Sequence, residues 1–359
     1  MPLSKPEVFI DAAAIEISWR DEKRNLSELI FDTVRRAIDE GGMGMTGITS
    51  VVLAAHDLVD GRSLSSMVTA PAAGAYLRDE IRYGDDVAAA FAAAVVRIEA
   101  GETERSIVAA WGRASEHDVD AVSRALFDPF FGSPLGMEEL HVSGMRAQSW
   151  IQAGGRCADR VAAVKRRRDA ARANPRALRG KGRGSQPSYP LSADDVPVWA
   201  DVVAAVIIST RPGRVKVSGM GQSSEPFAIG DRQLAAMPGL GRAAELAFRE
   251  SKVAPKDMDV IELDGLTLFD EALGLEAVGV AAKGEGLTTL ARDPRINASG
   301  GGAAGYCAPA MGLARIVEAT FQLQGRAGGI QLQDPRRALA TGSSIVAAQT
   351  HTAIVLEAI

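Results

Sequence analysis

Residues 297–312 read Asn297-Ala-Ser-Gly-Gly-Gly-Ala-Ala-Gly-Tyr-Cys-Ala-Pro-Ala-Met-Gly312, a glycine-rich loop that runs into an apolar segment. Glycine adopts positive φ and lets the main chain approach a ligand closely, and a helix after such a loop points its free N–H groups at that ligand. A tight surface turn would use the same glycines. The loop therefore needs support from the rest of the chain before it indicates a ligand site.

The chain repeats one order of elements, which favours two related α/β halves. Each half has an amphipathic helix, a strand, a glycine-marked turn into a nearly all-apolar helix, and a final strand. In that order, the paired segments are 26–38 and 241–250, 48–54 and 253–263, 83–97 and 311–321, and 106–111 and 352–356. A helix that is apolar on nearly every face must be buried on every face. We therefore predict two βαβαβ-type halves in a layered αβαβα arrangement.

Composition excludes several classes of protein. The chain has 359 residues, more than one hydrophobic core usually supports, and its 47% hydrophobic and 24% charged residues are ordinary for a globular protein. A net charge of −5 gives no reason to expect nucleic-acid binding. No apolar run approaches the ~20 residues of a membrane span, and the N-terminus lacks a signal-peptide pattern, so we expect a cytoplasmic protein.

Cysteine and histidine content argues against a metal site. The two cysteines cannot form a disulfide framework or a cysteine-rich zinc site, and the four histidines are scattered without ligand spacing. We therefore predict no metal.

Basic residues concentrate in the middle of an otherwise acidic chain. Residues 160–175 read as a basic amphipathic helix that stops at Asn174-Pro175, and 176–184 as a flexible basic loop. A solvated surface would explain both segments. The alternative is a surface that contacts the phosphates of an anionic ligand. The candidate contacts are Lys165, Arg166, Arg168, Lys181 and Arg183.

Four segments together resemble the thiolase superfamily, and within it the sterol-carrier-protein-type and lipid-transfer-protein-type branch. They are the helix that ends at Asn174-Pro175 and the segments 201–209, 260–279 and 297–312. The resemblance covers nearly the whole chain and implies a thiolase-like α/β fold with an inserted loop domain. The implied boundaries are an N-terminal half at 1–120 completed by 190–212, a loop domain at 121–189, and a C-terminal half at 213–359.

The sequence departs from the thiolase pattern wherever that pattern carries catalysis. Gly84 stands at the position of the acyl-accepting cysteine, Tyr306 at that of the Gly-His-Pro histidine, and Asp264-Gly265 at that of a His-Asp pair. Residues 340–345, which correspond to the loop of the second catalytic cysteine, contain no cysteine. An acyl-cysteine intermediate needs a thiolate and a base. We therefore exclude thiolysis through an acyl-enzyme.

The thiolase-like aldolases of steroid side-chain degradation share part of this pattern, with Tyr-Gly at the position of Tyr83-Gly84 and a tyrosine at that of Tyr306. They differ at Asp264-Gly265, where they have Tyr-Asp. Their retro-aldol cleavage of a β-hydroxyacyl-CoA needs a base and an oxyanion site but no nucleophile. The resemblance implies an acyl-CoA substrate, no tightly bound cofactor, and a small OB-fold and zinc-ribbon partner. It also implies a homodimer, whose interface we place near 106–111.

Two functions remain open at this point. One is making or breaking a C–C bond in an acyl-CoA without covalent catalysis. The other is a non-catalytic scaffold subunit of an acyltransferase or thiolase complex with an OB-fold partner.

The candidate catalytic residues each have a structural alternative. Tyr306 would handle the substrate hydroxyl proton, or pack in an apolar pocket. Asp264 would act as a base or relay, or simply form an Asp-Gly turn. His351 would be an acid/base group or a packed strand residue. Asn297 would hold the enolate oxygen, and Cys307 is predicted to be a small core residue.

Two glycines complete the predicted site. Main-chain N–H groups near Gly84 would hold the enolate oxygen together with the Asn297 side chain, and Gly305 would face the thioester. Asp85 and Asp86 follow Gly84 and are predicted to cap the next helix.

Overall fold

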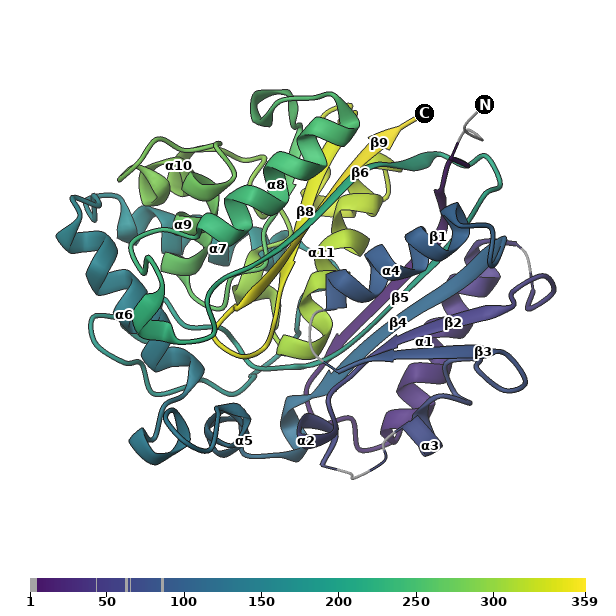
Figure 1. The fold of residues 1–359 in the computed structure, drawn as a ribbon, viewed down its shortest axis with the longest axis horizontal. Coiled ribbons are helices and arrows are strands. Elements are labelled where there is room, and N and C mark those ends of the chain that lie inside the picture. The colour runs from purple at the N-terminus through teal and green to yellow at the C-terminus, as the bar shows by residue number, and fades with distance from the viewer. Residues whose placement is uncertain (1–4, 43, 62–63, 65, 85–86) are drawn as a thin grey trace.

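The computed structural model describes the chain except residues 1–4, 43, 62–63, 65 and 85–86, and it has a layered α/β fold (Figure 1). The strands are β1 (Phe9–Ser18), β2 (Ser50–Ala54), β3 (Asp79–Tyr83), β4 (Arg105–Arg113), β5 (Asp201–Ser209), β6 (Val215–Ser224), β7 (Val260–Glu262), β8 (Arg337–Ser343) and β9 (Thr350–Ala358). The α-helices are α1 (Leu26–Glu40), α2 (Asp57–Asp60), α3 (Ser66–Thr69), α4 (Val87–Glu99), α5 (Val119–Leu126), α6 (Glu139–Gln152), α7 (Arg160–Ala173), α8 (Pro238–Ser251), α9 (Leu268–Ala277), α10 (Gly286–Arg292) and α11 (Ala308–Leu323).

The strands divide into two similar halves, as the repeat predicts. Their hydrogen-bonded order is β3-β2-β4-β5-β1-β6-β9-β8-β7, and Phe9 and Ile10 of β1 pair with β6 where the two halves join. In the first half β2 is parallel to β3 and β4, whereas β5 is antiparallel to β4 and β1. In the second half β7 is parallel to β8, and β9 is antiparallel to β8 and β6. A parallel bridge between Ile261 and Ile296 takes the place that β3 has in the first half.

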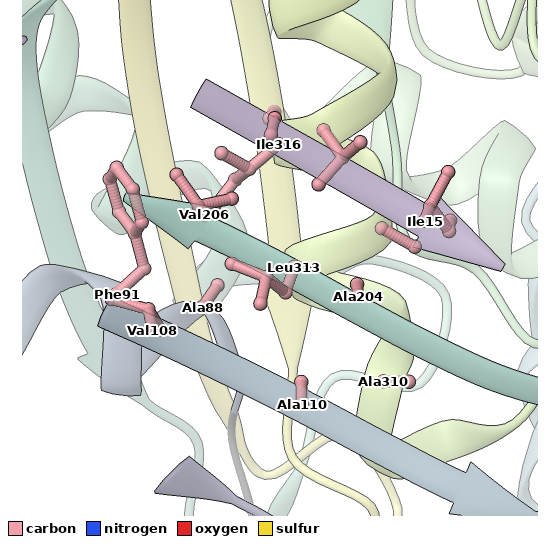
Figure 2. Close-up of a cluster of buried hydrophobic side chains, with 14 of the residues drawn as sticks. Ile15, Ala88, Phe91, Val108, Ala110, Ala204, Val206, Ala310, Leu313 and Ile316 are labelled. Atoms are coloured by element: carbon pink, nitrogen blue, oxygen red, sulfur yellow. The ribbon is translucent and has the colours of Figure 1, made fainter. Parts of the chain in front are cut away.

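Two apolar helices, α4 and α11, lie between the halves and contact strands of both. Every residue of α11 from Pro309 to Leu323 is buried. Figure 2 shows Phe91 of α4 and Leu313 of α11 among buried side chains of β4 and β5. Helix α1 packs on the first half and α8 on the second. The predicted αβαβα arrangement is confirmed.

Glycines in β6 explain how α8 lies so close to its sheet. A Cβ on Gly221 would lie 2.0 Å from the carbonyl oxygen of Ala243 in α8, and one on Gly219 would lie 2.2 Å from that of Ala247. Any side chain at these two positions would push the helix outward, so the outer layer of the second half depends on them.

The apolar run at 106–111, on which the predicted place of the dimer interface was based, is covered within this chain, so that place stays a prediction without this support. This segment belongs to β4, which is hydrogen-bonded to β2 on one side and β5 on the other. Helices of the same chain also contact it, so its apolar residues need no second copy to cover them. The strands at the two ends of the order are β3 and β7.

The segment between β4 and β5 contains α5, α6 and α7, where the sequence predicts an inserted loop domain. The domain boundaries themselves stay a prediction. The predicted helix caps Asp85 and Asp86 lie outside the described residues.

Candidate active site

The glycine-rich loop holds Tyr306 in a fixed position. Gly305 has φ 124°, and a Cβ there would lie 2.5 Å from Cγ2 of Ile17, so only glycine fits without displacement. Next along the chain, the Tyr306 N–H donates to the carbonyl of Val198 (2.8 Å), and its carbonyl accepts from the Ala200 N–H (3.0 Å). The Trp199 ring packs edge-on against the Tyr306 ring, with centroids 5.5 Å apart. Main-chain bonds and ring packing together limit the movement of Tyr306.

Tyr306 faces a cavity of about 50 Å³ with many polar side chains, here called the polar cavity. Its polar lining includes Glu139, Arg146, Asp264, Asp270, Tyr306 and Ser343. The structure thus brings together Tyr306 and Asp264, two of the four predicted catalytic residues.

Burial raises the pKa of Tyr306 well above its ordinary value, and the carboxylates of Asp264, Glu139 and Asp270 raise it further. The phenol therefore stays protonated at neutral pH. In this state it donates a hydrogen bond, and it can accept a proton only if it passes its own proton on to another group.

Asp264 and His351 are connected through Ser343. The Asp264 carboxylate accepts the Ser343 N–H (3.1 Å), and the Ser343 hydroxyl lies 3.0 Å from Nδ1 of His351. Nε2 of His351 lies 4.0 Å from the Glu225 carboxylate, which favours the tautomer with its proton on Nε2. Burial and two arginines lower the pKa of His351 to about 3. His351 is therefore a neutral acceptor behind the cavity, whose lining does not include it.

Helix α6 contributes residues that our reading of the sequence missed. The Ser143 hydroxyl donates to Asp270 (2.6 Å), and Arg146 forms a buried ion pair with Asp270 (3.4 Å). The Glu139 carboxylate accepts the Ala347 N–H (2.7 Å). Positions 139, 143 and 146 have the i, i+4, i+7 spacing of one helix face. That polar spacing was the signal available in the sequence.

A second cavity of about 50 Å³, here called the apolar cavity, adjoins the first. Its apolar lining includes Val59, Val119, Val122, Leu126, Leu140 and Pro309. The two cavities share the lining residues Glu139, Trp199, Ala308 and Ile345. Of the consecutive residues 306–309, Tyr306 lines only the polar cavity, Cys307 and Pro309 only the apolar one, and Ala308 both.

Cys307 has the features of a structural thiol. It is 2% exposed, and a Cβ on Gly112 would lie 2.4 Å from its sulfur, so the thiol packs directly against β4. Burial raises the pKa of Cys307 well above its ordinary value. A nucleophilic cysteine needs the opposite shift.

Asn297 does not belong to the lining of either cavity. Its side-chain oxygen accepts the Leu263 N–H (2.6 Å), and its own N–H donates to the carbonyl of Ile261 (2.7 Å). It thereby ties the glycine-rich loop to β7. Its side-chain nitrogen is buried without a hydrogen-bond partner among the described residues. The predicted contact with an enolate oxygen stays untested.

Beneath the loop lies a buried polar network. Arg315 of α11 donates to Glu262 (3.1 Å) and to the Ser299 hydroxyl (2.7 Å), while the Ser299 N–H donates to Glu262 (3.0 Å). Burial raises the pKa of Glu262, and the charge of Arg315 counters this shift. The network fixes the loop between β7 and α11.

The predicted phosphate contacts divide into groups. Lys165, Arg168 and Arg183 are paired with nearby carboxylates. Arg166 turns inward and donates to the carbonyl of Ile296, and burial lowers its pKa. Lys181 is exposed, and no ion pair involves it in the described part of the chain. The basic helix is thus partly a structural element.

Gly84, which the resemblance places at the position of the thiolase cysteine, is exposed and follows β3 directly. It is not among the residues that line either cavity. Within the described residues, no group of three or more His, Cys, Asp or Glu side chains could hold a metal ion, and no helix is long and apolar enough to cross a bilayer.

Residues 221–357 match the family model of the thiolase C-terminal domain. An acetyl-CoA acetyltransferase of Methanothermobacter thermautotrophicus is 32% identical over 162 residues, and human sterol carrier protein 2 is 33% identical over 125 residues. These alignments cover 40% and 32% of this chain, and only 42% and 23% of the two relatives.

Two solved structures match the whole fold. The Ltp2-ChsH2(DUF35) aldolase has a TM-score of 0.78 at 18% identity, with 99% of this chain and 98% of that chain covered. Human mitochondrial 3-ketoacyl-CoA thiolase has a TM-score of 0.71 at 13% identity, with 98% and 99% covered. Together the matches confirm the predicted thiolase-like fold and the resemblance to the thiolase superfamily and its sterol-carrier-protein-type branch.

Proposed function

We propose that this thiolase-like protein cleaves or forms a C–C bond in an acyl-CoA by retro-aldol chemistry, without an acyl-cysteine. One observation carries the proposal. At the two consecutive positions of the glycine-rich loop, Tyr306 lines a cavity with several carboxylates, whereas the Cys307 thiol packs against β4 with a raised pKa. The substrate would be a coenzyme A thioester, and no tightly bound cofactor is needed.

The proton of the substrate hydroxyl would leave through Tyr306. Because the phenol is protonated at neutral pH, it would pass its own proton to a carboxylate, for which Asp264 is the candidate, as it takes the proton from the substrate. The O–H electron pair would form the new carbonyl, the Cα–Cβ bond would break, and its electrons would move into the thioester enolate. A proton delivered to Cα would then give the shorter acyl-CoA.

The enolate oxygen needs positive charge or N–H donors near it. Helix α11 begins at Ala308, which lines both cavities, and no side chain caps this end of the helix. The first N–H groups of a helix attract negative charge. Pro309 has no N–H and the Ala310 N–H donates to the Cys307 carbonyl (2.9 Å), so the Ala308 N–H would be the donor at this end. Arg146, which also lines the polar cavity, would offset its carboxylates. These groups join Asn297 and the main chain near Gly84 as candidates for the oxyanion site.

The rest of the proposal concerns binding. Lys181 and the neighbouring basic loop would contact the phosphates of coenzyme A. A second copy of the chain would pair at β3, which is at the end of the strand order, and Tyr76 and Leu77 just before it are 70% and 87% exposed. The aldolase that matches the fold is described together with a DUF35 protein, which supports a small partner of that kind here.

A scaffold without catalytic activity is the second candidate. Each cavity measures about 50 Å³, which is too small for an acyl group joined to pantetheine unless the walls move. The clustered carboxylates would also repel an enolate. A scaffold would need neither room for an acyl group in these cavities nor positive charge to stabilise an enolate there.

A substrate screen separates the two candidates. The protein, both alone and in the complex recovered from its host, is incubated with 3-hydroxyacyl-CoA thioesters or with acetoacetyl-CoA, and products are identified by mass spectrometry. We expect a shorter acyl-CoA plus an aldehyde or ketone from the first, no thiolysis of the second, and no effect of iodoacetamide. If Tyr306→Phe and Asp264→Asn both cleave like the wild type, the polar cavity is not the active site, and if only the complex cleaves in that case, this chain is the scaffold. Absence of cleavage even in the complex also favours the scaffold.

A further inference from the structure

Residues 306–309 contribute to the lining of both the apolar cavity and the polar cavity. Because Ala308 lines both cavities while Tyr306 and Pro309 each line one, a group bound at Ala308 would meet hydroxyl chemistry on one side and an apolar wall on the other. Glu139, Trp199 and Ile345 complete this junction.

Part of the wall of the apolar cavity comes from α5. Val119, Val122 and Leu126 have the i, i+3, i+7 spacing of one helix face, and all three line the apolar cavity. Val119 is buried, whereas Val122 and Leu126 are only partly buried, so this apolar face lacks close packing partners where it meets the cavity. Unfilled apolar space of this kind gains dispersion and hydrophobic energy when an apolar group enters it.

The size of the cavity limits that group. A cavity needs about 10–15 Å³ of this kind of volume for each water-sized group. The available volume of about 50 Å³ therefore holds roughly three to five such groups. A short chain fits, and a fused or branched ring system does not.

We propose that the apolar cavity binds a short aliphatic substituent of the substrate's β-carbon, of about two to four carbons. The assignment rests on the proposed function for the identity of that carbon: its hydroxyl would lie toward Tyr306, and its alkyl chain would extend past Ala308 toward α5. The same cavity would hold the alkyl chain of the carbonyl product. The substrate class is thus a short-chain 3-hydroxyacyl thioester.

The product side allows a test that does not depend on turnover. A series from acetone through butan-2-one and pentan-2-one to hexan-2-one, with cyclohexyl methyl ketone as the bulky member, is titrated into the intact protein. Methyl NMR signals of Ala308 and Ile345 report binding at the junction of the cavities. Each added methylene that enters the cavity should tighten binding about fourfold, or roughly 15-fold from acetone to pentan-2-one. Binding should still tighten at hexan-2-one, whose butyl chain reaches the four-carbon limit of the cavity, and the ring ketone should bind more weakly than pentan-2-one.

Two variants locate the binding. Val122→Phe fills the cavity from a partly buried helix position and should weaken pentan-2-one binding at least tenfold, whereas Leu126→Ala enlarges it and should admit the ring ketone. Val96→Phe adds the same bulk on α4, where Val96 is 53% exposed, and should bind like the wild type. Thermal unfolding checks that each variant is folded.

The inference is overturned if no ketone binds saturably, if the ring ketone binds as tightly as pentan-2-one, or if Val122→Phe leaves binding unchanged. These outcomes concern ketone binding alone and do not depend on whether Tyr306 takes part in a reaction. A cavity that binds short ketones while Tyr306→Phe cleaves at the wild-type rate would refute the proposed reaction and leave the assigned cavity standing.

Discussion

Arg315→Met is expected to lower the free energy of unfolding by about 3–5 kcal/mol near neutral pH, because it leaves a buried carboxylate without its cation. Arg315 is 2% exposed and Glu262 is fully buried, so water cannot replace the lost partner. The Ser299 hydroxyl also loses a donor at 2.7 Å. The glycine-rich loop should also become more mobile, because Ser299 connects this loop to the Arg315–Glu262 ion pair.

The loss should depend on pH in a defined direction. Burial raises the pKa of Glu262, and the charge of Arg315 lowers it. Removal of Arg315 therefore raises the pKa of Glu262 further. A carboxyl whose pKa is higher in the folded than in the unfolded chain stabilises the fold at low pH. That contribution is lost as pH rises from the unfolded toward the folded pKa. The slope approaches about 1.4 kcal/mol per pH unit. Arg315→Met should therefore lose more stability between about pH 5 and 7.5 than the wild type does.

Urea unfolding followed by tryptophan fluorescence at both pH values measures the effect. Arg35→Met is the matched control, because Arg35 is 61% exposed in its pair with Asp39 and should change stability by less than about 1 kcal/mol. Adding Glu262→Gln to Arg315→Met should recover part of the loss and remove its pH dependence. The reasoning is refuted if Arg315→Met costs no more than Arg35→Met, or if its cost is the same at both pH values.

Three further changes test separate parts of the account. Gly305→Ala should cost about 1–3 kcal/mol in thermal or urea unfolding and reduce any cleavage activity, whereas Gly325→Ala, also at positive φ but with open space around it, should cost less and leave activity intact. Lys181→Ala should weaken coenzyme A binding about two- to fivefold at low salt in calorimetry, and less at high salt, while Lys256→Ala has no effect; equal affinities would remove Lys181 from the phosphate site. The pKa of His351 is lowered to about 3, so its contribution to stability is lost as pH falls from about 6.5 toward 3; His351→Asn should flatten this part of the acid-unfolding curve followed by circular dichroism, and an unchanged curve would contradict it.

The fold was predictable because its periodic signals are strong and repeated. The apolar segment 311–321 lies within α11, which is buried on every face, and the segments 26–38 and 241–250 lie within α1 and α8. The position of β4 was harder to predict. A strand covered by its neighbours in the same chain and a strand covered by a second copy have the same apolar sequence. Only the strand order shows that β4 is covered within its own chain.

The site was predictable only where one loop carries the signal. Tyr306 and Asp264 both line the polar cavity, as expected for residues that follow a glycine-rich loop and a strand end. Glu139 and Arg146 come from α6, whose place over the cavity depends on long-range packing. Arg166 was predicted to contact phosphate but turns inward to the carbonyl of Ile296, because a run of basic residues does not reveal which side chain is buried.

The most direct test of the central claim, C–C cleavage through Tyr306 without a thiol, compares Tyr306→Phe with Cys307→Ala in the complete complex. The rate of release of a shorter acyl-CoA from a short-chain 3-hydroxyacyl-CoA is measured for both, with coenzyme A affinity and oligomeric state as controls. We predict that Tyr306→Phe lowers the rate about 10²–10⁴-fold with both controls unchanged, while Cys307→Ala cleaves like the wild type. Cleavage that survives in Tyr306→Phe and disappears in Cys307→Ala would contradict the account.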